Sequence, residues 1–227
     1  MTPEALSPLL NGPGLVVDGS GASVFVGLLG ADGKWKSTIS QASSPLEGFF
    51  SSVETVLHSA QCQISDVSNF IYCEGPGSVL GLRLCAMAIR TWGYLSKQPS
   101  VRYFAYNSLE LTASLIVMDN PDVNNALLIS DWKKNVWNSI KIEGGKHGAI
   151  TTVDDQMVNS QKDVPLFYLP QRKGWQKIPE SVHTLEYSPQ RLPEVWHLLK
   201  RTKEIELYAS NMNVFKKWVP QRHRTPG

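Results

Sequence analysis

The chain has 227 residues, of which 42% are hydrophobic and 19% are charged. A chain of this length can bury a substantial core, and we expect it to form two lobes. The formal net charge is only +2. This excludes the class of proteins that bind nucleic acid through a broad, strongly positive surface. Any RNA contact is therefore expected to be local.

Composition also sets expectations for compartment and metal binding. Three cysteines, Cys62, Cys73 and Cys85, give an odd count with no spacing typical of a zinc site. No stretch approaches the roughly 20 apolar residues that span a bilayer, and the first residues have no signal-peptide pattern. We expect a cytoplasmic protein without membrane contact, disulfide framework or structural metal.

The first half of the chain alternates strands and helices. Short apolar runs between Gly and Ser turns predict three antiparallel strands, over residues 15–18, 23–29 and 34–39. Ser44, Pro45 and Glu47 form a helix-start signature, and apolar residues recur at helical spacing to about residue 60. The run 70–73 suits a buried parallel strand. This order is the ribonuclease H-like plan.

A second helix is expected from Ser78 to about Lys97. Its apolar residues cover most of the circumference, while Arg83, Arg90 and Lys97 fall in one stripe. A helix with such a narrow polar stripe is buried on two sides, either inside its own domain or partly against another protein. Periodicity alone leaves both alternatives open.

The second half repeats the alternation more loosely. A helix is expected over 108–117, and strands are expected over 101–105, 126–130 and 136–142. Further on, we place a strand near 182–187 and a helix near 192–199. The predicted fold class is α/β, with a mixed sheet that starts with three antiparallel strands. The expected domains are an N-terminal lobe (1–104), a smaller C-terminal α/β lobe (105–206) and a basic tail (207–227).

A glycine-rich turn lies between the strand 70–73 and the second helix. Its residues Gly75 and Gly77 allow a tight turn, and Ser78 can cap the helix. The turn has neither the Lys of a Walker A loop nor the spacing of a dinucleotide-binding loop, so a structural turn is favoured over a phosphate cradle. The candidates for a cofactor contact are Asp18, Gly75, Gly77 and Ser78.

The longer segment from Glu74 to Arg83, EGPGSVLGLR, closely resembles the G-P-G-S-F-T-G-[LV]-R segment of the TsaB (YeaZ) family. Three further segments agree in the same order: LVVDGS (15–20) with I-D-T-S, NSLE (107–110) with S-S-L-E, and DWKKNVW (131–137) with D-A-R-x-x-E-V-Y. Leu207-Tyr208 with the following KKW resembles the terminal P-x-Y-L-R region. The resemblance spans nearly the whole chain.

This resemblance implies a compact form of the sugar kinase, Hsp70 and actin (ASKHA) superfamily, with two ribonuclease H-like lobes. It also implies a non-catalytic role. Members bind a TsaD-type paralogue that transfers threonylcarbamoyl to adenosine next to the tRNA anticodon, and the pair recruits a TsaE-type ATPase. No cofactor is implied for this chain alone, and ATP or ADP is a candidate at the interface with the TsaD-like partner.

Departures from the family pattern keep alternatives open. Gly19 stands where the family has Thr, and Val79-Leu80 replace Phe-Thr, which removes hydroxyls from both turns. One alternative is an ATP-dependent kinase-like ASKHA member in which Asp18 organises a metal and the turns hold phosphate. Another is a diverged TsaB-like interaction protein. The five histidines form no i, i+4 pair, which argues against a TsaD-like metalloenzyme.

Two surfaces are predicted to contact partners. The helices that begin near Pro45 and Ser78 are expected to lie side by side and to bind a TsaD-like paralogue, or a second copy of the chain in isolation. The predicted interface residues are Phe49, Val53, Leu57, Arg83, Leu84, Ala88 and Trp92. The candidate RNA contacts are Lys216, Lys217, Trp218, Arg222 and Arg224, and the alternative for them is a solvated tail.

Overall fold

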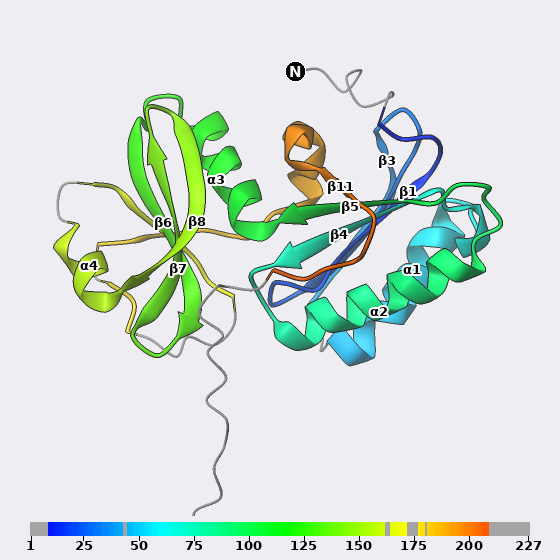
Figure 1. Ribbon diagram of the computed structural model, residues 1–227, viewed down its shortest axis with the longest axis horizontal. Helices are drawn as coiled ribbons and strands as arrows, with labels where there is room; N and C mark the ends of the chain where they lie inside the picture. The colour runs from blue at the N-terminus through cyan, green and yellow to red at the C-terminus, as the bar shows by residue number, and fades with distance from the viewer. Residues whose placement is uncertain (1–8, 43–44, 162–163, 172–176, 180, 209–227) are drawn as a thin grey trace, which may run out of the picture.

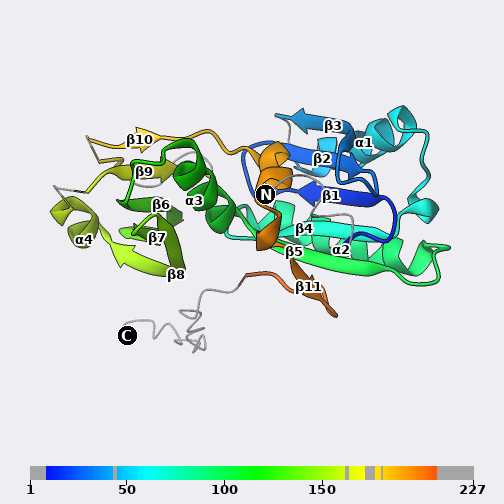
Figure 2. The ribbon, with the colours of Figure 1, turned by 90° about the horizontal axis from the view of Figure 1, so that it is seen from above.

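The computed structural model describes residues 9–42, 45–161, 164–171, 177–179 and 181–208. These residues form two lobes side by side, each built on one mixed β-sheet (Figure 1). Seen from above, the two sheets follow one another along the long axis of the molecule (Figure 2). Among the described residues, no helix combines the length and apolar character that crossing a bilayer requires.

The first lobe contains a six-stranded sheet in the order β11-β5-β4-β1-β2-β3. Its strands are β1 (Gly14–Asp18), β2 (Val24–Leu29), β3 (Trp35–Gln41), β4 (Asn69–Gly75), β5 (Arg102–Asn107) and β11 (Lys200–Thr202). The β1–β4 and β4–β5 pairs are parallel, and the other three pairs are antiparallel. The predicted plan of three antiparallel strands, a helix and a parallel strand is confirmed.

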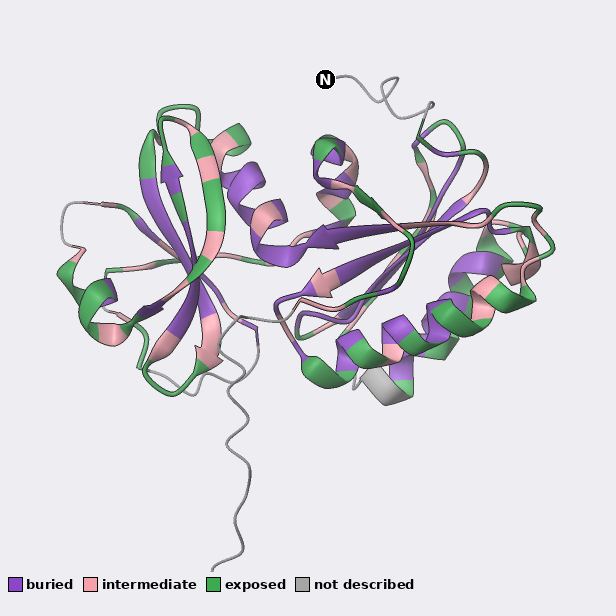
Figure 3. Cartoon of the chain, in the orientation of Figure 1, coloured by how far each residue is buried: buried purple, intermediate pink, exposed green. Residues whose placement is uncertain are grey.

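Two helices, α1 (Pro45–Ser59) and α2 (Val79–Leu95), cover one face of this sheet. Phe49 and Val56 of α1 and Ile89 of α2 are fully buried against it. Ser78 caps α2, because its Oγ accepts a hydrogen bond from the backbone N–H of Gly81 at 3.3 Å. Figure 3 shows the resulting division of both helices into a buried inner stripe and an exposed outer one.

The opposite face of the first sheet is covered by chain that returns from the second lobe. Two short 3₁₀ turns, η3 (Pro189–Glu194) and η4 (Trp196–Leu198), pack there with Phe104 and Tyr106 of β5. The helix expected near 192–199 is present as these two short 3₁₀ segments and not as one continuous α-helix. Pro193 lies inside η3, and a proline lacks the N–H that a continuing α-helix needs.

The second lobe contains a five-stranded sheet in the order β10-β9-β6-β7-β8. Its strands are β6 (Asn125–Lys133), β7 (Val136–Glu143), β8 (Lys146–Asp154), β9 (Leu166–Leu169) and β10 (His183–Thr184). The helix α3 (Ser108–Asp119) packs on it through Leu109, Ala113 and Ile116, and the short helix α4 (Asp155–Ser160) follows β8. β8 and β9 were not predicted, and β10 is shorter than the expected strand.

The chain crosses between the lobes at other residues than the expected boundaries at 104 and 206. β5 belongs wholly to the first sheet, so the chain enters the second lobe after Asn107. It returns to the first lobe at Pro189, and β11 pairs with β5. The two lobes are therefore joined by two crossings of the chain.

The inner face of α1 can be tested with two adjacent phenylalanines. Phe49→Ala should lower the free energy of unfolding by about 3–5 kcal/mol, because it removes a fully buried ring. Phe50 is 54% exposed, so Phe50→Ala is the matched control and should cost about 1 kcal/mol or less. Urea unfolding followed by circular dichroism measures both. Equal losses would contradict this orientation of α1.

Candidate functional site

A buried carboxylate lies at the junction of the two lobes. Asp18 ends β1 and is 1% exposed. Its Oδ1 accepts a hydrogen bond from the backbone N–H of Ser20 at 2.7 Å, and its Oδ2 accepts from the hydroxyls of Tyr106 at 2.5 Å and Tyr187 at 2.6 Å. These donors replace the water that a buried charge would lose. Asp18 therefore connects β1, β5 and the segment after β10.

The groups around Asp18 are held in their neutral forms. Burial raises the pKa of both Tyr106 and Tyr187 well above the usual range, and the nearby charge of Asp18 adds to each shift. Burial likewise raises the pKa of the Cys73 thiol, whose sulfur lies 3.9 Å from the hydroxyl oxygen of Tyr187. A thiol held neutral in this way is a poor nucleophile. The cluster is suited to structure rather than to reaction.

The turn after β1 and the turn after β4 are in direct backbone contact. The N–H of Ser78 donates to the carbonyl of Ser20 at 2.8 Å. A Cβ on Gly19 would lie 2.9 Å from the carbonyl of Gly81, and a Cβ on Gly77 would lie 2.6 Å from the Cβ of Ser20. Both distances are too short for a side chain, so glycine is required at these positions.

The second lobe also holds the turn after β4. The carbonyl of Pro76 accepts hydrogen bonds from Ser108 Oγ at 2.7 Å and from Gln171 Nε2 at 2.9 Å, and both donors are buried. Gly75 has a φ of 118°, which favours glycine. The structure thus brings the four candidate cofactor contacts together, but in a packed junction where Ser78 serves as a helix cap.

Asp131, which the family motif also pointed to, organises the end of the second sheet. Its Oδ2 accepts from the hydroxyl of Tyr168 at 2.8 Å and from the backbone N–H of Gln171 at 3.4 Å. Burial, followed by the hydrogen bond to Asp131, raises the pKa of Tyr168. The other oxygen of Asp131 is buried and has no hydrogen-bond partner among the described residues.

Sequence reasoning missed the donors at this junction. Tyr187 lies 169 residues from Asp18 in the chain, and Gln171 lies 95 residues from Pro76. Single tyrosines and glutamines carry no local signal of such distant contacts. The sequence motifs identify the two turns. The side chains that form hydrogen bonds at these turns can be identified only from the fold.

The outer face of α1 and α2 is a second candidate site. Along α2, Leu80, Met87 and Tyr94 recur every seven residues and are 47%, 64% and 92% exposed. We call these three, with Leu84 and Thr91 between them, the α2 row. Large apolar side chains aligned and exposed in this way are uncommon on monomeric proteins.

The α1 side of this surface is aromatic. Phe50 is exposed, and its ring meets Trp92 edge-on with the ring centroids 6.4 Å apart. A groove of about 540 Å³ beside them is lined by Phe50, Leu57, Ile64 and Trp92, among others. The exposed surface therefore continues from the α2 row onto α1.

The predicted interface residues need a correction in light of this orientation. Four of the seven lie in the core of the first lobe: Phe49, Val53, Leu57 and Ala88. Phe49, Val53 and Leu57 point inward because α1 packs on β2 and β3, and Ala88 points inward because α2 packs on β4 and β1. The other three, Arg83, Leu84 and Trp92, keep some exposure.

Two other expectations concern RNA and metals. The candidate RNA contacts Lys216, Lys217, Trp218, Arg222 and Arg224 lie outside the described residues. Within the part of the chain that the structure describes, no group of three or more His, Cys, Asp and Glu side chains is placed to hold a metal ion.

No family model and no curated protein matches the sequence. Solved structures do match. YeaZ from Pseudomonas aeruginosa has a TM-score of 0.56 at 16% identity, over 78% of this chain and 85% of that chain. An uncharacterized protein with similarity to peptidase YeaZ from Pseudomonas aeruginosa has a TM-score of 0.57 at 16% identity, over 82% and 90%. The chain shares the fold of YeaZ, which confirms the predicted fold class.

The tyrosines at Asp18 predict a loss of stability at alkaline pH. In the unfolded chain the hydroxyls of Tyr106 and Tyr187 ionise at about pH 10, while in the folded chain the pKa of each is raised. Their contribution to stability is therefore complete below about pH 10 and is lost as the pH rises from there through the folded pKa. Urea unfolding at a series of pH values should show this decline.

Tyr187→Phe separates this effect from general alkaline unfolding. The variant should lose about 1–3 kcal/mol at neutral pH, because Asp18 loses one donor. It should also show a shallower decline above about pH 10, since one fewer buried hydroxyl titrates. Tyr94→Phe, at an exposed position, should keep the wild-type profile. A Tyr187→Phe profile parallel to wild type would contradict the assignment.

Proposed function

We propose that this chain is a non-catalytic scaffold subunit of the TsaB (YeaZ) type that works in the cytoplasm. It binds a TsaD-type threonylcarbamoyltransferase and supports threonylcarbamoyladenosine modification of tRNA next to the anticodon. The observation that carries the proposal is the exposed apolar face of α1 and α2 on a chain with the YeaZ fold. The motif from Glu74 to Arg83 supports it, because that segment starts α2.

The α2 row suits packing against a helix of another subunit. Its members are separated alternately by four and three residues, the spacing that keeps one seam of a helix facing a partner helix: Leu80, Leu84, Met87, Thr91 and Tyr94. Met and Tyr are enriched in interface cores, and Arg83 beside the row is suited to the polar rim. In the absence of a paralogue, the same row on a second copy can complete a symmetric homodimer.

The packing of the two turns counts against the kinase-like alternative. Phosphate binding at glycine-rich turns uses free backbone N–H groups and open space above the glycines. Here the N–H of Ser20 is bonded to Asp18, and the N–H of Ser78 is bonded to the carbonyl of Ser20. The space above Gly19 and Gly77 is filled by the neighbouring turn. The scaffold role makes no demand on these groups.

The proposal has two further components that follow from the family resemblance. A TsaE-type ATPase is recruited by the pair, with ATP or ADP held at the interface with the TsaD-like partner rather than by this chain alone. tRNA is contacted through the complex, and the basic residues after Tyr208 are candidates for that contact.

Charge placed in the α2 row should abolish partner binding. Met87→Glu and Tyr94→Glu each bury a carboxylate in an apolar interface, so affinity for the purified TsaD-type paralogue of the same genome should fall by at least about 100-fold. Size-exclusion chromatography with light scattering measures the complex. The matched control is Met157→Glu on α4, because Met157 is 48% exposed in the second lobe.

The same preparations distinguish the alternatives. The two α2 variants should be monomeric in analytical ultracentrifugation where the wild type self-associates, and cells that depend on them should lose threonylcarbamoyladenosine from digested tRNA. Unchanged paralogue binding by both variants would refute the helix interface. A wild-type homodimer with no affinity for the paralogue would instead favour a diverged interaction protein.

A further inference from the structure

A groove lies between the second half of α1 and the end of α2. We call it the Trp92 groove, and it is lined by Phe50, Glu54, Leu57, His58, Cys62 and Trp92, among others. Its volume is about 540 Å³, within the range of about 300–1,000 Å³ found for small-molecule pockets, so a large side chain fits into it. Through Phe50 and Trp92 the groove continues the exposed surface of the α2 row onto α1.

The walls of the groove are fixed by the way in which α1 ends. Gln61 has a φ of 51°, its N–H donates to the carbonyl of His58 at 3.0 Å, and the N–H of Cys62 donates to the carbonyl of Leu57 at 3.0 Å. This is the Schellman arrangement, which turns the chain back directly after the helix. The 3₁₀ turn η2 (Ile64–Asp66) follows and packs beside α2. The walls are therefore formed before a partner binds, and little ordering entropy opposes binding there.

The apolar side of the groove is a corner made by two aromatic rings. Trp92 is stacked on the buried ring of Phe49, with the ring centroids 5.8 Å apart and the planes at 20°. Phe50 meets Trp92 at 89°, so these two rings stand nearly perpendicular to each other. Aromatic pairs prefer edge-to-face and offset stacked contacts. A third ring that enters this corner can make both kinds of contact.

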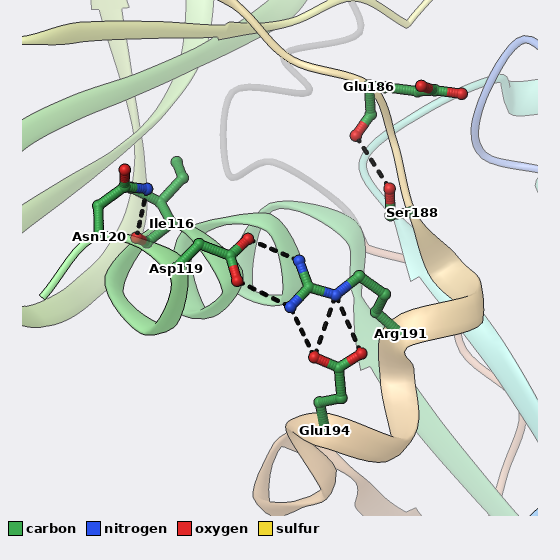
Figure 4. A network of polar contacts seen from close by, with 7 residues as sticks. All are labelled: Ile116, Asp119, Asn120, Glu186, Ser188, Arg191 and Glu194. Atoms are coloured by element: carbon green, nitrogen blue, oxygen red, sulfur yellow. Dashed lines mark hydrogen bonds and ion pairs between the residues drawn. The ribbon is translucent and has the colours of Figure 1, made fainter.

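The charge at the rim of the groove favours a cation. Glu54 is exposed, and neither Glu54 nor His58 forms an ion pair with any described residue. The acidic groups near the end of α3 differ, because Arg191 binds both Asp119 and Glu194 with N–O distances of 2.6 Å (Figure 4). Those two acids are paired within the chain, whereas the Glu54 carboxylate is open to a lysine or arginine of another protein.

We propose that the Trp92 groove receives an aromatic side chain of the TsaD-type partner, and that a neighbouring lysine or arginine of the partner pairs with Glu54. This inference rests on the proposed scaffold function and states which side chains the partner must present. An aromatic side chain buried in a pocket near the centre of an interface is typical of the few residues that carry most of the binding energy. The α2 row supplies contact area, and the groove selects the partner.

Filling the groove tests the proposal in the full chain. His58→Trp and Cys62→Trp each place an indole at the groove, so affinity for the purified TsaD-type paralogue of the same genome should fall by at least about 30-fold. Thr55→Trp is the matched control, because Thr55 is exposed on α1 and does not line the groove. Isothermal titration calorimetry measures the affinities, and urea unfolding shows that each variant is folded.

The charge at the rim has a separate test. Glu54→Gln should weaken paralogue binding by about 2–5-fold, as expected for an ion pair at the edge of an interface. The difference from wild type should shrink as sodium chloride is added, because salt screens the pair. Glu143→Gln is the control, since Glu143 is exposed in the second lobe. An unchanged affinity of Glu54→Gln would contradict the pairing.

The outcomes separate the groove from the scaffold function. Full affinity of both filled variants, with wild-type binding intact, would overturn the groove proposal and leave the scaffold function standing. Filled variants that lose the homodimer but keep the paralogue would show that a second copy is the occupant, which would also overturn it. A wild type that does not bind the paralogue would overturn both proposals.

Discussion

The hydrogen bonds to the Asp18 carboxylate hold together three segments that are far apart in the chain. A buried carboxylate without a cation is stable only if donors surround it, and here the donors are Ser20, Tyr106 and Tyr187. Each donor comes from a different segment, so the charge is satisfied only when β1, β5 and the chain returning from the second lobe meet. Removing the carboxylate would leave two buried hydroxyls without an acceptor, which explains why the contact dominates the junction.

The glycine turns depend on the same meeting of segments. With Asp18 fixed, Ser20 is placed so that its carbonyl receives the N–H of Ser78, and α2 starts from that contact. The second lobe then reaches the preceding residue, Pro76, through Ser108 and Gln171. These contacts join the two lobes at the turn between β4 and α2. The turns that could face a phosphate face protein instead.

The sequence predicted the first sheet and its helices well, because strand alternation, helical period and the Ser78 cap all agree there. It could not predict the outward face of α2, because Leu80 and Met87 on one side are as apolar as Leu82 and Ile89 on the other. Only the packing against the sheet distinguishes the two sides. The sequence also could not place the 3₁₀ segments after Pro189, since their burial comes from β5, which is distant in sequence.

The proposed scaffold role requires a binding surface that stays in one arrangement, and the junction restricts movement of α2. Coupling between distant sites needs an element with two discrete arrangements. The β4–α2 turn is instead bonded to the first lobe through Ser78 and to the second through Pro76, so α2 cannot shift without breaking contacts on both sides. The outer face of α2 therefore belongs to a helix whose N-terminal end is hydrogen-bonded to both lobes.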